Sequence, residues 1–287
     1  MLWFYLSLAC ALSVALVDVL SKKALGLSDP FVIAWVRLGY AIPFLALSFL
    51  WIAVPPLDGT FFWALLFLLP LETAALVLYT HALRESPLSL TIPFLALTPV
   101  FLIGIAFVML GERPDLSGTA GILLIAMGAY LLNIHTRNEG WLAPLRAILR
   151  EGGSRKMIVV ALLYSLTASL GKVAIQHSSP AFFGAVYFPM IALVSLPYFG
   201  VTAGRRGFHT LVSQKGLFLL IGFIQTVMIF THVLAISLVE VPYMIAVKRT
   251  SLLFTIIFGY LFFRETRIRE RLLGAACMVA GVVLILI

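Results

Sequence analysis

Charged residues are scarce in this chain. Asp, Glu, Lys and Arg together make up 11% of its 287 residues, whereas soluble domains contain about 25%. Hydrophobic residues make up 62%, and the mean hydropathy is +1.09. This composition excludes an ordinary soluble domain and indicates a polytopic membrane protein that lies in a lipid bilayer.

Cysteine is almost absent as well. Cys10 and Cys277 both lie in apolar runs, and we interpret them as small buried side chains rather than as a disulfide or a metal site. We find no His-rich metal spacing, paired acids or nucleophile motif, so we expect no cofactor, no metal and no enzymatic activity. The net charge of +8 comes from short basic stretches between apolar runs. That distribution is typical of membrane-protein loops, and no nucleic acid partner is expected.

Ten apolar runs divide the chain, each close to the roughly 20 residues that a membrane-spanning helix needs. The runs are 2–21, 31–53, 61–82, 88–110, 117–134, 157–176, 181–201, 215–236, 242–263 and 270–287. Turn signals such as Pro55-Pro56 and Gly204 separate several of them. The one long polar connection, 135–156, contains the segment 141–150, which suits a short helix at the membrane interface.

The two halves of the chain repeat each other. The aligned segments and residues are Leu20 to Ala24 with Leu170 to Ala174, His81 with His232, Glu112 with Glu265, and Gly121 and Gly128 with Gly274 and Gly281. Each copy holds five runs, and because five is odd the second copy enters the membrane from the opposite side. The sequence thus predicts an all-α polytopic membrane protein with about ten transmembrane helices in two inverted five-helix repeats around a central cavity. The repeats would cover 1–134 and 157–287, joined by the basic loop 135–156.

The pair Lys248-Arg249 lies inside the apolar run 242–263. Each charge costs about 2.5–3.5 kcal/mol at the centre of a membrane helix, so such residues usually face a partner or a water-filled cavity. Snorkelling to the interface would serve one of them, but adjacent helix positions point about 100° apart. We therefore interpret the pair as a site for an anion, in which Arg supplies a planar fork and Lys a compact charge.

Residues 82–134 carry a recognisable pattern: a helix with a late Pro99, a closing Gly111-Glu112, and a final helix with spaced glycines. This pattern resembles the second half of an EamA repeat in the drug/metabolite transporter superfamily, and the second copy has Glu265 and the same glycines. The resemblance covers essentially the whole chain. It implies a ten-helix basket with a central cavity and transport of a small metabolite.

Lys248-Arg249 is also similar to a Lys-Arg pair in the ninth helix of the plastid triose-phosphate/phosphate translocators, a branch of the same superfamily. There the pair binds a phosphate. That branch has a further Lys in the fourth helix, where this chain has Leu95. Because Leu95 replaces that Lys, the resemblance supports anion binding in general rather than a phosphate sugar as the substrate.

Glu72 lies near the middle of the run 61–82, just after Pro70. It would serve as a proton-coupling carboxylate, as a partner of Lys248 or Arg249 in the empty carrier, or as a hydrogen-bond partner for backbone freed by the proline. Gln225 is its approximate counterpart in the second repeat and is expected to line the same cavity.

The remaining candidates are weaker. For the repeat equivalents His81 and His232 we favour a shared structural role over substrate binding or protonation. Arg37 can snorkel to the interface, Tyr79 can supply a hydroxyl to the cavity or belong to an aromatic belt, and Lys172 has no acid four residues before it. In contrast, Lys22 follows Asp18 at that spacing, and these two can neutralise each other.

We therefore expect a secondary transporter for a small anionic organic metabolite, driven by a coupling proton or a counter-substrate, with the oligomeric state left open. The alternatives are an exporter of amino acids or other zwitterions and a flippase for a lipid with a phosphate headgroup. Fifteen Lys and Arg lie in the loops after runs one, three, five, seven and nine, against Arg113 alone on the other side. The positive-inside rule then predicts both termini outside the cytoplasm, although better-known ten-helix relatives have both inside. We expect a multi-pass protein of the bacterial inner (plasma) membrane.

Overall fold

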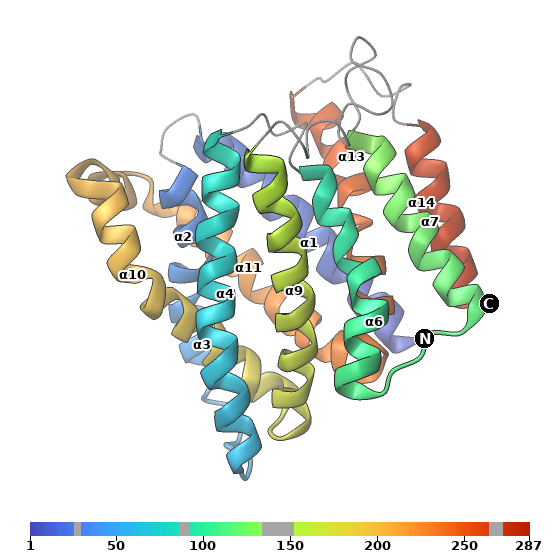
Figure 1. Cartoon of the computed structure of the whole chain (residues 1–287). Coiled ribbons are helices and arrows are strands. Elements are labelled where there is room, and N and C mark those ends of the chain that lie inside the picture. Colours follow the sequence, from blue (N-terminus) through green and yellow to red (C-terminus); the bar gives the residue numbers. More distant parts are fainter. Residues whose placement is uncertain (26–29, 86–91, 134–151, 264–271) are drawn as a thin grey trace.

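The computed structural model describes residues 1–25, 30–85, 92–133, 152–263 and 272–287, and in these segments the chain is helical and contains no strand (Figure 1). Six helices are long and apolar enough to cross a membrane, and four shorter apolar helical stretches complete the set. In a bilayer each backbone N–H and C=O group must be satisfied within its own segment, which favours helices. The predicted all-α polytopic membrane fold is confirmed.

The helices of the first half are α1 (Leu2–Leu25), α2 (Pro30–Gly39), α3 (Ile42–Ser48), α4 (Gly59–Glu85), the 3-10 helix η1 (Ile92–Leu97), α6 (Thr98–Leu110) and α7 (Leu116–Asn133). Those of the second half are α9 (Gly152–Gln176), α10 (Pro180–Ser213), α11 (Lys215–Leu238), α12 (Val241–Lys248), α13 (Ser251–Phe263) and α14 (Leu272–Leu286). Helix α9 begins inside the predicted loop 135–156, and α10 continues past 201 through a kink where Gly204 has a φ of 56°. The expected interface helix at 141–150 lies outside the described residues.

The predicted run 31–53 forms two helices, α2 and α3, rather than one. The repeat-equivalent runs 88–110 and 242–263 each form two elements as well. The second elements, α6 and α13, have 13 residues each and are related by an offset of 153 residues. A threonine hydroxyl donates to the carbonyl three residues earlier at each break: Thr98 to Leu95 at 2.8 Å and Thr250 to Val247 at 2.7 Å. Such bonds compete with the helical ladder and bend the helix. The two repeats therefore contain the same discontinuity, and Lys248-Arg249 lies at one of the two breaks.

Helices α7 and α14 pack side by side (Figure 1), and their glycines lie where the two backbones are closest. A Cβ atom on Gly121 would lie 2.6 Å from the carbonyl oxygen of Gly281, and one on Gly128 would lie 2.6 Å from that of Gly274. Each glycine therefore meets the repeat counterpart of the other one. This reciprocal pairing is what two inverted repeats produce at their symmetry axis.

Other helix pairs follow the same symmetry. Helix α1 packs on α11, and its repeat equivalent α9 packs on α4, which is the equivalent of α11. Each of these pairs joins one half of the chain to the other. The outer surface is apolar, with large side chains such as Trp51, Val108 and Val201 fully open to the surroundings, as expected for a surface that faces lipid.

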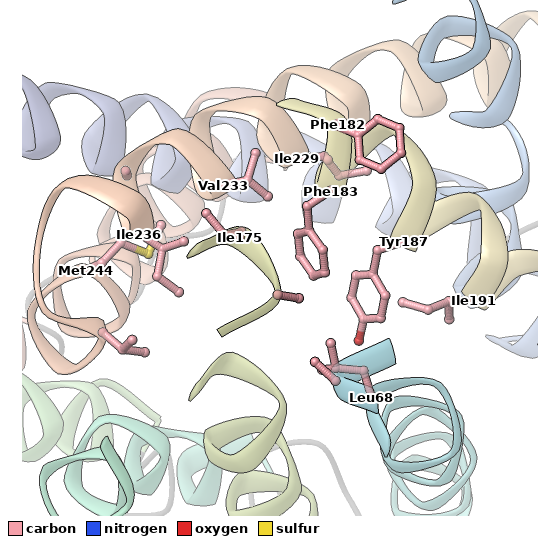
Figure 2. Packing of buried hydrophobic residues seen from close by; sticks show 14 of the residues in the cluster. Leu68, Ile175, Phe182, Phe183, Tyr187, Ile191, Ile229, Val233, Ile236 and Met244 are labelled. Atoms are coloured by element: carbon pink, nitrogen blue, oxygen red, sulfur yellow. The ribbon is translucent and has the colours of Figure 1, made fainter. Parts of the chain in front are cut away.

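An apolar cluster fills the space between α4, α9, α10, α11 and α12 (Figure 2). Leu68, Ile175 and Ile229 belong to it, and Phe183 stacks on Tyr187 with ring centres 4.9 Å apart. The cluster separates the polar residues described below from the end of the bundle that holds both chain termini.

Candidate substrate-binding site

Arg249 joins the two helix breaks. It follows the last residue of α12, and its Nη2 donates a hydrogen bond of 2.9 Å to the hydroxyl of Thr98, the first residue of α6. The Nε–H of Arg249 is buried and has no acceptor. One guanidinium edge is thus held by the first repeat while part of the group is left without a partner.

The side chain of Lys248 makes no hydrogen bond or ion pair with any residue that the structure describes. It lies within electrostatic range of Cys10 on α1, Glu72 on α4 and His232 on α11. Lys248 and Arg249 therefore face different neighbours, as their roughly 100° separation on a helix requires.

Arg37 has partners on another helix. Its Nη2 forms an ion pair of 2.6 Å with Asp18, and its Nε donates to the hydroxyl of Ser21 at 3.1 Å. Tyr79 and Tyr164 lie within electrostatic range of this pair. The partner of Asp18 is thus Arg37, from another helix, and not the neighbouring Lys22, because the carboxylate faces α2 rather than the next turn of α1.

Glu72 lies on α4 beside Thr167 and Tyr187. It is in electrostatic range of Lys248, but the two groups are farther apart than the 4.0 Å of an ion pair. Within the described segments no hydrogen bond joins Glu72 to the backbone near Pro70. The Tyr187 hydroxyl lies close to Glu72 but is buried and has no partner within hydrogen-bond distance.

The two repeat-equivalent histidines have different surroundings. His81 Nε2 and the Tyr198 hydroxyl lie 3.1 Å apart, between α4 and α10. His232 lies near Lys248, and its Nδ1 is buried without a partner. Gln225 is buried on α11, two helical turns before His232. Of the two histidines, only His232 is brought to the Lys248-Arg249 pair.

Lys172 lies elsewhere. Its Nζ contacts Glu112 at 2.5 Å and the carbonyl of Val239 at 2.7 Å. Lys172 is eight residues beyond Tyr164 on α9, about 12 Å along the helix axis. It belongs to the contacts at the terminal end of the bundle and not to the cluster around Lys248 and Arg249.

The polar cluster is accessible in part. The side chains of Arg37 and Asp18 keep 33% and 38% of their surface accessible although Tyr79, Tyr164 and Arg249 approach them from other segments. At the terminal end of the bundle, the side chains of Lys172 and Glu112 keep only 11% and 10% of their surface accessible.

Two acidic groups at the terminal end lie outside the membrane-spanning segments. The pKa of Asp115 is lowered by the backbone N–H of Gly118, by the hydroxyl of Tyr243 and by that of Ser117. The pKa of Asp58 is lowered by the backbone N–H of Phe61 and by a contact with His177. Both carboxyl groups are thus held in the ionised form.

The sequence did not single out Thr98 or Asp18 as parts of the site. The position of Thr98 directly before Pro99 in an apolar run could have indicated a helix break there, since both residues disturb a helix. The described residues contain no group of three His, Cys, Asp or Glu side chains that could hold a metal. The cluster thus contains two cations that have no carboxylate partner among the described residues, one nearby carboxylate and several hydroxyls.

Comparison with known proteins identifies a family and a shared fold. No curated protein matches the chain. One solved structure, described only as a crystal structure of a protein, superposes with a TM-score of 0.77 at 13% identity, covering 100% of this chain and 97% of that one. This likeness shows a shared fold. A family model described as the EamA-like transporter family matches residues 1–134 and 154–287. The chain therefore belongs to the EamA-like transporter family and is an integral, multi-pass membrane transporter of the drug/metabolite transporter superfamily.

Proposed function

We propose that this transporter moves a small organic anion, bearing a carboxylate or a phosphate, and that Lys248 and Arg249 bind the anionic group. The observation that carries the proposal is a contrast between cations within the bundle. Arg37 and Lys172 each have a carboxylate partner at 2.5–2.6 Å. Lys248 and Arg249 have none among the described residues.

An unpaired charge inside a bundle is costly, and a bound counter-charge relieves the cost. Arg249 suits this role, because its bond to Thr98 orients the guanidinium and its buried Nε–H has no acceptor. Charge-assisted bonds from Arg to carboxylate or phosphate are among the stronger hydrogen bonds in proteins. Lys248 adds a second charge at the next position of the chain.

The location of the pair suits alternating access. Arg249 in the second repeat bonds to Thr98 in the first, so an anion there would contact both halves. Inverted-repeat transporters place their substrate between the repeats and open it to each side in turn. We propose this mechanism here, with a proton or a counter-substrate as the coupled species.

A zwitterion such as an amino acid is the second candidate. Glu72 lies in range of Lys248 without contacting it, so a ligand could place its carboxylate against the cations and its ammonium against Glu72. A flippase has less support. The apolar groove on the α6 and α9 surface is lined by Phe101, Leu162 and similar side chains and holds no charged group for a lipid phosphate.

Ligand-induced thermal stabilisation of the purified protein tests the proposal. Inorganic phosphate, succinate and an amino acid such as leucine serve as probes, with glucose as a neutral control. A ligand at 100 times its Kd stabilises the folded state by about 2.7 kcal/mol. We expect stabilisation by at least one anion, and its loss in the double variant Lys248→Gln/Arg249→Gln.

The matched control is Arg113→Gln, which removes an exposed arginine that lies over the Phe107 ring at 4.5 Å. This variant should respond to the anion as the wild type does. If the double variant is folded and still stabilised by the same anion, the pair is not the site. Glu72→Gln separates the two candidates, because it should weaken the response to leucine and leave the response to succinate in place.

We also propose that both termini lie outside the cytoplasm of a bacterial inner membrane, on the strength of the basic loops at the other end. A reporter active only in the cytoplasm, fused after Ile287, should give no signal. A cytoplasmic signal would reverse the orientation.

A further inference from the structure

Glu112 of the first half contacts two parts of the second half at the terminal end of the bundle. One carboxylate oxygen lies 2.5 Å from Lys172 Nζ on α9, and the other accepts the backbone N–H of Val241 at 2.7 Å. Lys172 in turn donates to the carbonyl of Val239. One buried ion pair therefore connects α9 with both the end of α11 and the start of α12.

Further bonds between the halves lie close by. The Tyr243 hydroxyl on α12 and Asp115 are joined by two bonds of 3.1 Å, and His177 Nδ1 lies 2.6 Å from Asp58. Towards the middle of the bundle, Ile236 and Met244 are buried in the apolar cluster (Figure 2). The terminal end is thus closed by polar contacts with an apolar layer behind them.

The opposite end differs. Among the described residues there, Lys156 and Glu85 form an ion pair between the halves whose side chains keep 34% and 41% of their surface accessible. A bond of 2.7 Å from the Tyr40 hydroxyl to the Leu211 carbonyl joins α2 to α10. Between these contacts Arg37 and Asp18 remain one-third exposed. Among the described residues, the ion pair between the halves at the terminal end is therefore more deeply buried than the one at the other end.

We propose that Glu112 and Lys172 form a latch that holds the terminal end closed, and that Glu112 is also a positioning residue for the substrate site. This inference rests on the alternating-access function proposed above. The link is helix α12, which begins at Val241 under Glu112 and ends at Lys248. Eight residues span about 12 Å, so a short rigid element connects the latch to the cations.

The arrangement gives the latch a defined effect on access. While Glu112 holds the N-terminus of α12, the helix stays against the apolar layer and Met244 is inaccessible. A shift of α12 when an anion binds at its other end would pull the Val241 N–H away from Glu112. It would also displace the neighbouring Val239 carbonyl, which accepts a hydrogen bond from Lys172. Opening at the terminal end would then follow occupancy of the site.

Cysteine accessibility in the full-length protein tests the latch. In a Cys10→Ala/Cys277→Ala background, Met244→Cys is labelled in proteoliposomes or cells with a membrane-impermeant maleimide applied from the face that holds the termini. We expect slow labelling with the latch intact. Glu112→Gln and Lys172→Met should each raise the rate at least about fivefold, the lower end of typical allosteric couplings. Lys172→Arg keeps the charge and should stay slow.

The matched control is Lys156→Gln, which removes the exposed ion pair between the same two halves and should leave the rate unchanged. Monodisperse elution checks that each variant is folded. Unchanged labelling in both folded latch variants would overturn the proposal, and so would an equal increase in Lys156→Gln, since that would mean general loosening. No substrate is present, so the result does not depend on anion binding. The variant Lys248→Gln/Arg249→Gln, which should fail to respond to an anion, should still label slowly.

Discussion

The glycines at the crossing of α7 and α14 give a prediction that links the repeat to packing. A Cβ on Gly121 would lie 2.6 Å from the carbonyl oxygen of Gly281 and 2.8 Å from a side-chain carbon of Ile285, and a Cβ on Gly281 would lie 2.6 Å from the carbonyl oxygen of Gly121. Ordinary contacts of this kind begin near 3.4 Å. Each alanine would thus need a shift of the facing backbone by close to an ångström.

The size of the effect follows from that shift. A backbone carbonyl cannot rotate away as a side chain can, so Gly121→Ala must move one helix against the other. Overpacking of this kind costs about 1–3 kcal/mol. Without a clash, replacing glycine by alanine in a helix interior stabilises the helix by about 1 kcal/mol. At the site of closest approach we expect the clash to exceed that gain.

The matched control is Gly104→Ala on α6, where a Cβ would meet nothing within 4 Å. This variant should be as stable as the wild type or slightly more stable. Gly121→Ala and Gly281→Ala should both be less stable, by similar amounts, because their environments are reciprocal. At roughly 2–4 °C per kcal/mol for a large domain, the apparent Tm of each should fall by a few degrees.

These differences are measured by heating each variant in the same detergent and using size-exclusion chromatography to determine the folded fraction at each temperature. Equal apparent Tm values for Gly121→Ala and Gly104→Ala would refute the close crossing. A loss in Gly121→Ala without one in Gly281→Ala would refute the reciprocal pairing of the repeats.

Two further predictions concern ion pairs. Asp18→Asn removes the carboxylate partner of Arg37. It should lower the apparent Tm, because a partly buried charge without a partner is less favourable than the absence of both charges. The double variant Asp18→Asn/Arg37→Met should recover part of the loss, and a double variant less stable than Asp18→Asn would contradict this reasoning. The lowered pKa of Asp58 means that its ionised form stabilises the folded state above the ordinary carboxyl pKa of about 4, and this contribution disappears as the pH falls through the lowered value. The apparent Tm of Asp58→Asn should therefore depend less on pH below about 4 than that of the wild type, and parallel curves would show that Asp58 does not contribute.

Much of the fold could be predicted from the sequence because the signals are local. A run of about 20 apolar residues by itself predicts a membrane-spanning helix. Because each repeat has five runs, an odd number, the second repeat must be inverted relative to the first. The breaks at Thr98 and Thr250 were not predicted, since apolar runs 88–110 and 242–263 have the length of single helices. The deciding feature is a hydroxyl bonded to its own backbone, which hydropathy does not reveal.

The candidate site was predicted in part. Lys248 and Arg249 lie together at a helix break within the bundle, with Glu72 and His232 near Lys248. Lys172 was considered for the substrate because no acid stands four residues before it, yet its partner Glu112 comes from 60 residues earlier in the chain. Arg37 similarly finds Asp18 on another helix. A sequence pattern can pair charges only along one helix, so partners from other helices stay hidden.

The sequence by itself determined the membrane location, the helical fold, the two inverted repeats and the presence of two adjacent cations at membrane depth, because each depends on the order of residues along the chain. The tertiary structure alone decided which cations have carboxylate partners among the described residues. It also decided that Glu112 and Lys172 form a buried ion pair at the terminal end. Both depend on how helices far apart in the chain cross, and an ion pair forms only where that crossing brings the charged atoms within contact distance.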